Sequence, residues 1–141
     1  MEVPIRVDGR YRVRGCIGSG AYGAQCLIHD MISAYFLPGA VYRATDIYKK
    51  RDVALKLEPA EDSSYLENEA EVYESLAGLS GFPKLLWYGS DAGLHALAMD
   101  LLGPSLAMLQ ASLGRFSLKT VGMVAFQTVS GLCYLFSRYS I

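Results

Sequence analysis

Three features of the sequence combine residue types that can bind a phosphate group. One is a glycine-rich run, Gly18-Ser19-Gly20-Ala21-Tyr22-Gly23, in which the missing Cβ atoms let backbone N–H groups approach an anion closely. Another is Lys56, a cation within an otherwise apolar run, and the third is Glu69, a carboxylate further along the chain. A lysine can neutralise phosphate oxygens, and a carboxylate can hold that lysine in place. The combination predicts a site for a phosphate-bearing ligand.

The glycine pattern alone is typical of more than one class of protein. A Gly-x-Gly-x-x-Gly run also opens dinucleotide-binding folds, in which an amphipathic helix follows the last glycine. No such helix pattern follows Gly23, and no acidic residue ends a second parallel strand at the expected distance. An ordinary hairpin turn remains the alternative for the glycines. The alternative for Lys56 is a lysine on an edge strand, with its aliphatic part along the strand and its ammonium group in the solvent.

The residues around Lys56 predict a β-strand over 52–58. Its large apolar side chains alternate with the others, and they are Val53, Leu55 and Leu57. Successive residues of a strand point to opposite faces, so Lys56 shares the other face with Ala54 and Glu58. A lysine that faces inward needs a partner of opposite charge.

A helix that follows this strand can supply the partner. The capping box Ser64-Tyr65-Leu66-Glu67 predicts its first turn, and Gly78 and Pro83 lie beyond its end. At 100° per residue, Glu69 lies within the apolar face, whereas the other glutamates of the helix lie on the solvent side. The predicted apolar face consists of Leu66, Ala70, Tyr73, Leu76 and Ala77. We therefore expect Glu69 to meet Lys56.

The remaining elements are predicted from alternation, capping residues, glycines and prolines. Strands are expected over 11–17, 41–47, 85–88 and 95–99, and helices capped by Ser105 and Ser117 over 105–113 and 117–136. A turn over 89–93 joins the last two strands, and Gly103-Pro104 interrupts the chain before the helices. This order predicts an α+β fold with an N-terminal extension (1–10), an α+β lobe (11–102) and the incomplete start of a helical lobe (103–141).

Composition favours a folded globular protein. With 52% hydrophobic and 19% charged residues, the chain is too apolar for intrinsic disorder. The net charge of −1 gives no long-range attraction to nucleic acid or to an anionic membrane, so neither is expected as a partner.

Two further observations bear on the compartment. The scattered cysteines Cys16, Cys26 and Cys133, and an N-terminus without a signal-peptide core, favour reduced thiols in the cytoplasm or nucleus. The uncharged segment 120–137 is interpreted as a buried helix, with a membrane span as the alternative.

Four segments are similar to one protein family. They are Ile17-Gly18-Ser19-Gly20, Val53-Ala54-Leu55-Lys56-Leu57-Glu58, Met99-Asp100-Leu101-Leu102-Gly103-Pro104-Ser105-Leu106 and Phe116-Ser117-Leu118-Lys119-Thr120-Val121. On these residues the sequence resembles the casein kinase 1 branch of serine/threonine protein kinases, from Tyr11 to Tyr139 with one interruption. The Leu-Leu-Gly-Pro-Ser-Leu and Phe-Ser-Leu-Lys-Thr runs are specific to that branch.

The resemblance implies a kinase N-lobe, with an antiparallel sheet and an αC-type helix, followed by the hinge and the first two helices of the C-lobe. It implies ATP as the ligand, with the glycine run over the phosphates and Ile17 among the ATP-binding residues. Lys56 and Glu69 would hold the α- and β-phosphates, the lysine as the cation and the glutamate orienting it.

The resemblance also assigns residues to the adenine. Met99 would lie behind the ring, and Val41 and Ala54 would line its faces. The backbone of Asp100 and Leu102 would bond the adenine edge, and Leu101 would be exposed.

Residues 24–39 depart from the family pattern. Family members pass from the third glycine almost directly into the second strand, whereas this segment separates Gly23 from Ala40. A retained in-frame intron or a gene-model error is our interpretation, and a true loop insertion is the alternative. Cys26, His29 and Asp30 lie in the segment, but no further ligands are spaced for a metal site.

The sequence contains neither a His-Arg-Asp nor an Asp-Phe-Gly motif. No catalytic residue is therefore expected in this chain, and the Mg²⁺ that the family uses lacks its ligands. The function implied is the ATP-binding portion of a protein Ser/Thr kinase, inactive alone, with a protein substrate only if a complete C-lobe exists. The alternatives are a pseudokinase-like nucleotide-binding or interaction module and a gene-model fragment.

Exposed apolar residues over 117–136 predict non-specific self-association.

Overall fold

The computed structural model describes residues 6–19, 39–60 and 64–139. The chain divides into two compact units, Met1–Leu102 and Gly103–Ile141. In the described residues, the first unit carries a sheet and one helix, and the second carries two helices.

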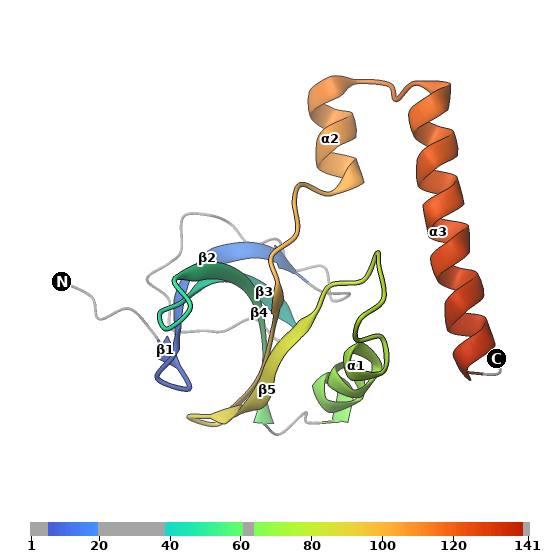
Figure 1. Ribbon diagram of the computed structural model, residues 1–141. Helices are drawn as coiled ribbons and strands as arrows, with labels where there is room; N and C mark the ends of the chain where they lie inside the picture. Colours follow the sequence, from blue (N-terminus) through green and yellow to red (C-terminus); the bar gives the residue numbers. More distant parts are fainter. Residues whose placement is uncertain (1–5, 20–38, 61–63, 140–141) are drawn as a thin grey trace. The chain divides into compact units, whose positions relative to one another are not determined.

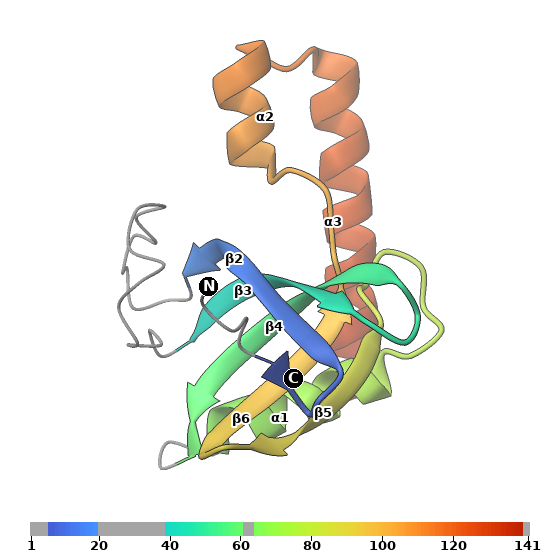
Figure 2. The ribbon, with the colours of Figure 1, turned by 90° about the vertical axis from the view of Figure 1, so that its left-hand side faces the viewer.

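The first unit is built on a curled antiparallel sheet with six strands in its described part (Figures 1 and 2). Its strand order is β1-β2-β3-β4-β6-β5. The strands are β1 (Arg6–Val7), β2 (Tyr11–Ser19), β3 (Ala40–Asp46), β4 (Arg51–Pro59), β5 (Leu85–Asp91) and β6 (Leu94–Asp100). With helix α1 (Ser64–Ser75) they form an α+β fold, as the order of sequence patterns predicts.

Alternation along β4 divides its side chains between two apolar clusters, one on each face of the sheet. The cluster on the first face contains Val7, Tyr11, Ala44, Val53, Leu55, Leu57, Ala96 and Ala98. The cluster on the second face contains Ala54, Leu66, Ala70, Leu97 and Met99. β4 is hydrogen-bonded to β3 on one side and to β6 on the other, so it is fixed in the centre of the sheet.

Helix α1 packs on the second face through Leu66 and Ala70, and Tyr73 packs against the same cluster. Leu76, directly after the helix, is also buried. The prediction that Ala77 belongs to this face is wrong. Ala77 is exposed because the helix ends at Ser75 and Ala77 lies in the turn that follows.

Two features of the sheet are not predicted by the sequence pattern. β1 pairs with β2 and buries Val7, so Arg6 and Val7, within the segment interpreted as an N-terminal extension, belong to the sheet. The β5–β6 turn consists of Ala92 and Gly93, at φ values of 50° and 78°, and does not span 89–93. This backbone is typical of a two-residue type I′ hairpin, which lets β5 continue to Asp91.

The prediction of three reduced thiols is wrong for Cys16, which is disulfide-bonded. Cys133 is a free, exposed cysteine, and Cys26 lies outside the described residues. Localisation in the cytoplasm or nucleus stays a prediction. Of its two arguments, the one from reduced cysteines does not hold for Cys16, and the one from the N-terminal sequence is unchanged.

The second unit consists of α2 (Leu106–Leu113) and α3 (Leu118–Tyr139). Both helices begin at the predicted caps. The Ser105 Oγ accepts a hydrogen bond from the Met108 N–H at 3.2 Å, and the Ser117 Oγ accepts one from the Thr120 N–H at 3.1 Å.

Helix α3 is apolar and uncovered along most of its length. Its span Leu118–Ser137 is long and apolar enough to cross a membrane, with a mean hydropathy of 1.3, and none of that span is buried. One such helix is weak evidence for a membrane span, and the prediction of a buried helix is not confirmed. Its large exposed apolar side chains are Leu118, Val121, Met123, Phe126, Val129, Leu132 and Phe136.

We expect the chain to self-associate through α3, because burial of apolar surface is favourable by about 25 cal/mol per Å². Replacing Val121 and Leu132, which are 50% and 46% exposed, with glutamate should shift the protein toward monomer in light scattering. The matched control is Gln127→Glu, a polar position on the same helix. A wild-type protein that is a monodisperse monomer with a cooperative thermal transition would contradict the prediction.

Candidate functional site

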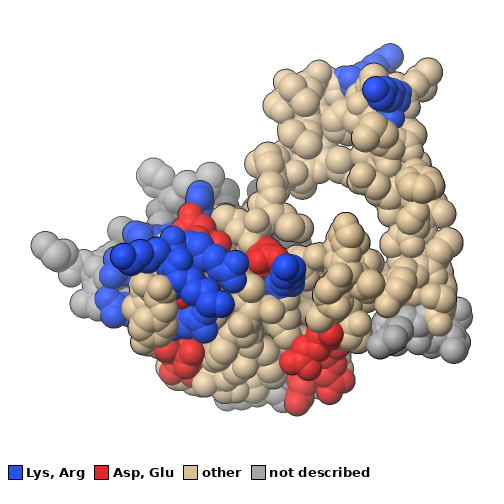
Figure 3. All heavy atoms as spheres, viewed as in Figure 1, with Lys and Arg blue, Asp and Glu red and all other residues tan. Residues whose placement is uncertain are grey.

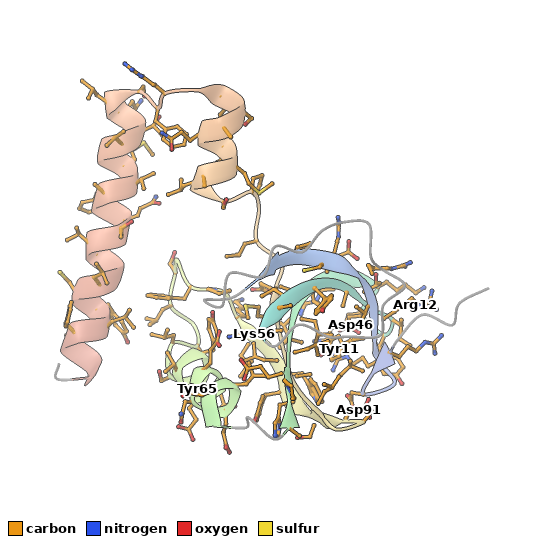
Figure 4. The ribbon with its side chains drawn as sticks, turned by 180° about the vertical axis from the view of Figure 1, so that it is seen from behind. Tyr11, Arg12, Asp46, Lys56, Tyr65 and Asp91 are labelled. Carbon is orange, nitrogen blue, oxygen red and sulfur yellow. The ribbon has the colours of Figure 1, made fainter. Side chains whose placement is uncertain are left out.

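Lys56 and Glu69 form an ion pair that joins β4 to α1. The Lys56 ammonium donates a hydrogen bond to the Glu69 carboxylate. The lysine side chain is only 18% exposed and that of Glu69 31%, so water screens the pair poorly. Figure 4 shows Lys56 lying between the sheet and α1. The structure thus brings together the two residues that strand and helix periodicity place face to face.

Val41, Ala54 and Met99 lie on the same face of the sheet as Lys56. In the register of the sheet, Val41 is opposite Lys56 and Ala54 is opposite Met99. Ala54 and Met99 are buried members of the apolar cluster, and Val41 packs against it. Two residues along a strand span about 6.6 Å, so Lys56 and Ala54 lie within the length of one nucleotide, although Ala54 and Met99 themselves have little exposed surface.

At the end of β6, only some of the polar backbone groups are available to a ligand. The Asp100 N–H donates to the Lys84 carbonyl at 3.1 Å, so only the carbonyl of Asp100 could bond an adenine edge. Leu102, whose backbone is the other predicted contact, is a 65% exposed residue. The prediction that Leu101 is exposed is wrong, because Leu101 is half-buried against the apolar cluster under α1.

Most of the predicted phosphate loop lies outside the described residues. Ile17, 51% exposed, and Gly18 belong to the end of β2, where Gly18 is opposite Val41 and has open space around its Cα. The side chain of Ser19, residues 20–23 with Ala21 and Tyr22, and segment 24–38 are not described. The glycine run is therefore placed only at its first end, next to Val41.

Two charged residues of this face were not among the predicted site residues. Glu58 lies two positions after Lys56 on β4, and its Oε1 is 3.7 Å from the Lys56 Nζ. Arg43, opposite Ala54 in the register, pairs with Asp52 at 2.6 Å. Strand alternation does place Glu58 on the Lys56 face, but alternation alone gives no sign of its burial.

Two titratable groups on this side of the sheet have pKa values shifted by their neighbours. Burial raises the pKa of the Tyr73 phenol, and the negative charge of Glu69 raises it further, so Tyr73 stays neutral. The hydrogen bond from Arg43 lowers the pKa of Asp52, so this exposed carboxyl stays ionised. In Figure 3, basic side chains gather over the β2–β3 side of the first unit and acidic ones over α1.

The described residues contain no group of three His, Cys, Asp or Glu side chains that could hold a metal ion. The residues considered for a metal in the insertion, Cys26, His29 and Asp30, lie outside the described part.

A separate open hollow of about 560 Å³ lies between the end of α1 and β5, and neither Lys56 nor Val41 lines it.

No protein-family model matches the chain. The fold and the site together define an α+β protein with a partly buried lysine–glutamate pair beside a small apolar cluster. A lysine held in this way can bind an anionic group, and the adjoining apolar surface can contact a flat ring.

Proposed function

We propose that residues 11–102 form the ATP-binding lobe of a casein kinase 1-like serine/threonine protein kinase. The observation that carries the proposal is the Lys56–Glu69 pair, formed between a central strand and the helix that covers it. The branch-specific Leu-Leu-Gly-Pro-Ser-Leu run directly after β6 supports the family assignment.

The chemistry of the residues on this face fits ATP. Lys56 supplies a cation for the phosphates, and Glu69 orients it because the carboxylate fixes one of the three ammonium hydrogens. The apolar side chains of Ala54, Met99 and Val41 lie on the same face as Lys56 and are the proposed contacts for the adenine. The Asp100 carbonyl is an acceptor for the adenine amino group.

ATP supplies the phosphoryl group that kinases of this family transfer. The transfer requires a base and metal ligands from the His-Arg-Asp and Asp-Phe-Gly motifs, which these 141 residues do not contain. This observation favours a second candidate function for the chain by itself, a non-enzymatic nucleotide-binding module.

Isothermal titration calorimetry with ATP tests the proposal. We expect saturable binding to the folded chain, and no transfer of radiolabelled phosphate to an acidic casein-type substrate, because positioning without metal ligands leaves the phosphoryl charge unscreened. Folded protein that does not bind ATP would rule out both candidate functions. Phosphate transfer that disappears in Lys56→Met would favour an enzyme over a binding module.

A further inference from the structure

The Lys56 ammonium lies between two carboxylates that come from different elements. Glu69 belongs to α1, and Glu58 belongs to the same strand as Lys56. Because the two residues are two positions apart on β4, Glu58 and Lys56 necessarily share a face. Strand β4 is hydrogen-bonded on both sides, so the Glu58–Lys56 spacing does not depend on where α1 lies.

Glu58 depends on Lys56 more than Glu69 does. The Glu58 side chain is 11% exposed, against 31% for Glu69. Its second oxygen, Oε2, is buried without a hydrogen-bond partner, and Lys56 is its ion-pair partner among the described residues. A buried carboxylate that loses its cation is strongly destabilising, so movement of the ammonium away from Glu58 is opposed.

We propose that Glu58 is a positioning residue that holds the Lys56 ammonium over the sheet independently of α1. This inference rests on the proposed function, because it assigns the phosphate-binding role to Lys56. When Glu69 is lost or α1 moves away, Glu58 keeps the lysine on the ligand face and stops it from extending into solvent. The two carboxylates are therefore redundant tethers, and the effects of removing them are not additive.

A double-mutant cycle on ATP affinity tests the proposal with the full chain. We expect Glu58→Gln and Glu69→Gln each to weaken the Kd for ATP by less than about twofold, and the double variant to weaken it by about tenfold or more, well beyond the roughly fourfold product of two independent effects. Glu71→Gln, which removes an exposed carboxylate of α1, is the matched control and should bind as the wild type does. Additive effects, or a Glu69→Gln variant as weak as the double variant, would overturn the proposal.

Thermal denaturation separates this inference from the proposed function. Lys56→Met should lower the Tm by at least about 4 °C more when it is made in the wild type than when it is made in the Glu58→Gln variant. In the wild-type background the substitution leaves Glu58 charged and unpaired, whereas in the Glu58→Gln background no carboxylate remains at position 58. If the wild type binds no ATP, the proposed function fails, and this cycle alone decides whether Lys56 and Glu58 are coupled. Equal Tm losses in both backgrounds would overturn the inference.

Discussion

Replacement of Asp46 by alanine is expected to lower the free energy of unfolding by about 3–5 kcal/mol. The Asp46 side chain is fully buried and accepts two hydrogen bonds from the Arg10 guanidinium, at 3.1 and 2.7 Å. It also accepts from the backbone N–H groups of Tyr48 and Lys49, each at 3.1 Å, in the turn before β4. The alanine variant leaves a largely buried cation and two turn amides without their acceptor.

The matched control is Asp52→Ala, which removes an aspartate from an exposed pair. Asp52 bonds Arg43, but both side chains are well exposed, at 38% and 54%. Exposed pairs contribute about 0–1 kcal/mol, so urea denaturation should separate the two variants clearly. Equal losses of stability would show that the Arg10–Asp46 contact is incidental to the fold.

The same aspartate predicts how stability depends on pH. The hydrogen bond from Arg10 is the main cause that lowers the pKa of Asp46 from 3.8 to about 2. A lowered pKa in the folded state means that the stabilisation is complete above about pH 4 and is lost as the pH falls toward about 2. The gap in stability between the wild type and Asp46→Ala should therefore be largest near neutral pH and narrow in acid.

Local patterns in the sequence predict the elements whose determinants lie within a few residues of one another. Alternation places Lys56 opposite to the Val53–Leu57 stripe, and the structure separates them in the same way. The 100° periodicity of α1 singles out Glu69, which is the glutamate that pairs with Lys56. Ser105 and Ser117 cap α2 and α3 because capping is a contact over three residues.

Contacts between distant residues could not be predicted in this way. Strand β1 is two residues long, too short for a periodic signal, and its position depends on pairing with β2. Arg10 and Asp46 lie 36 residues apart, so no local pattern relates them. The burial of Glu58 depends on the elements packed around β4, which the alternation of one strand does not specify.

Replacing Lys56 with methionine should weaken ATP binding by about 10- to 100-fold, which corresponds to about 1.4–2.7 kcal/mol. Methionine keeps much of the apolar stem but removes the only ion-pair partner that the described structure gives to Glu58 and Glu69. Under the proposed function, the variant therefore loses the cation that we assign to the phosphates. It also leaves two negative charges on the same face, which repel them.

Calorimetry with ATP and with adenosine measures the two parts of this effect. The loss should be large for ATP and small for adenosine, because adenosine carries no phosphate and, under the proposal, contacts only the apolar residues Val41, Ala54 and Met99. Lys84→Met, which removes an exposed cation of the same unit, is the matched control for net charge and should bind ATP nearly as the wild type does. If Lys56→Met stays folded and binds ATP as tightly as the control, the ammonium does not face the phosphates. The Lys56–Glu69 pair would then be only a structural link between β4 and α1.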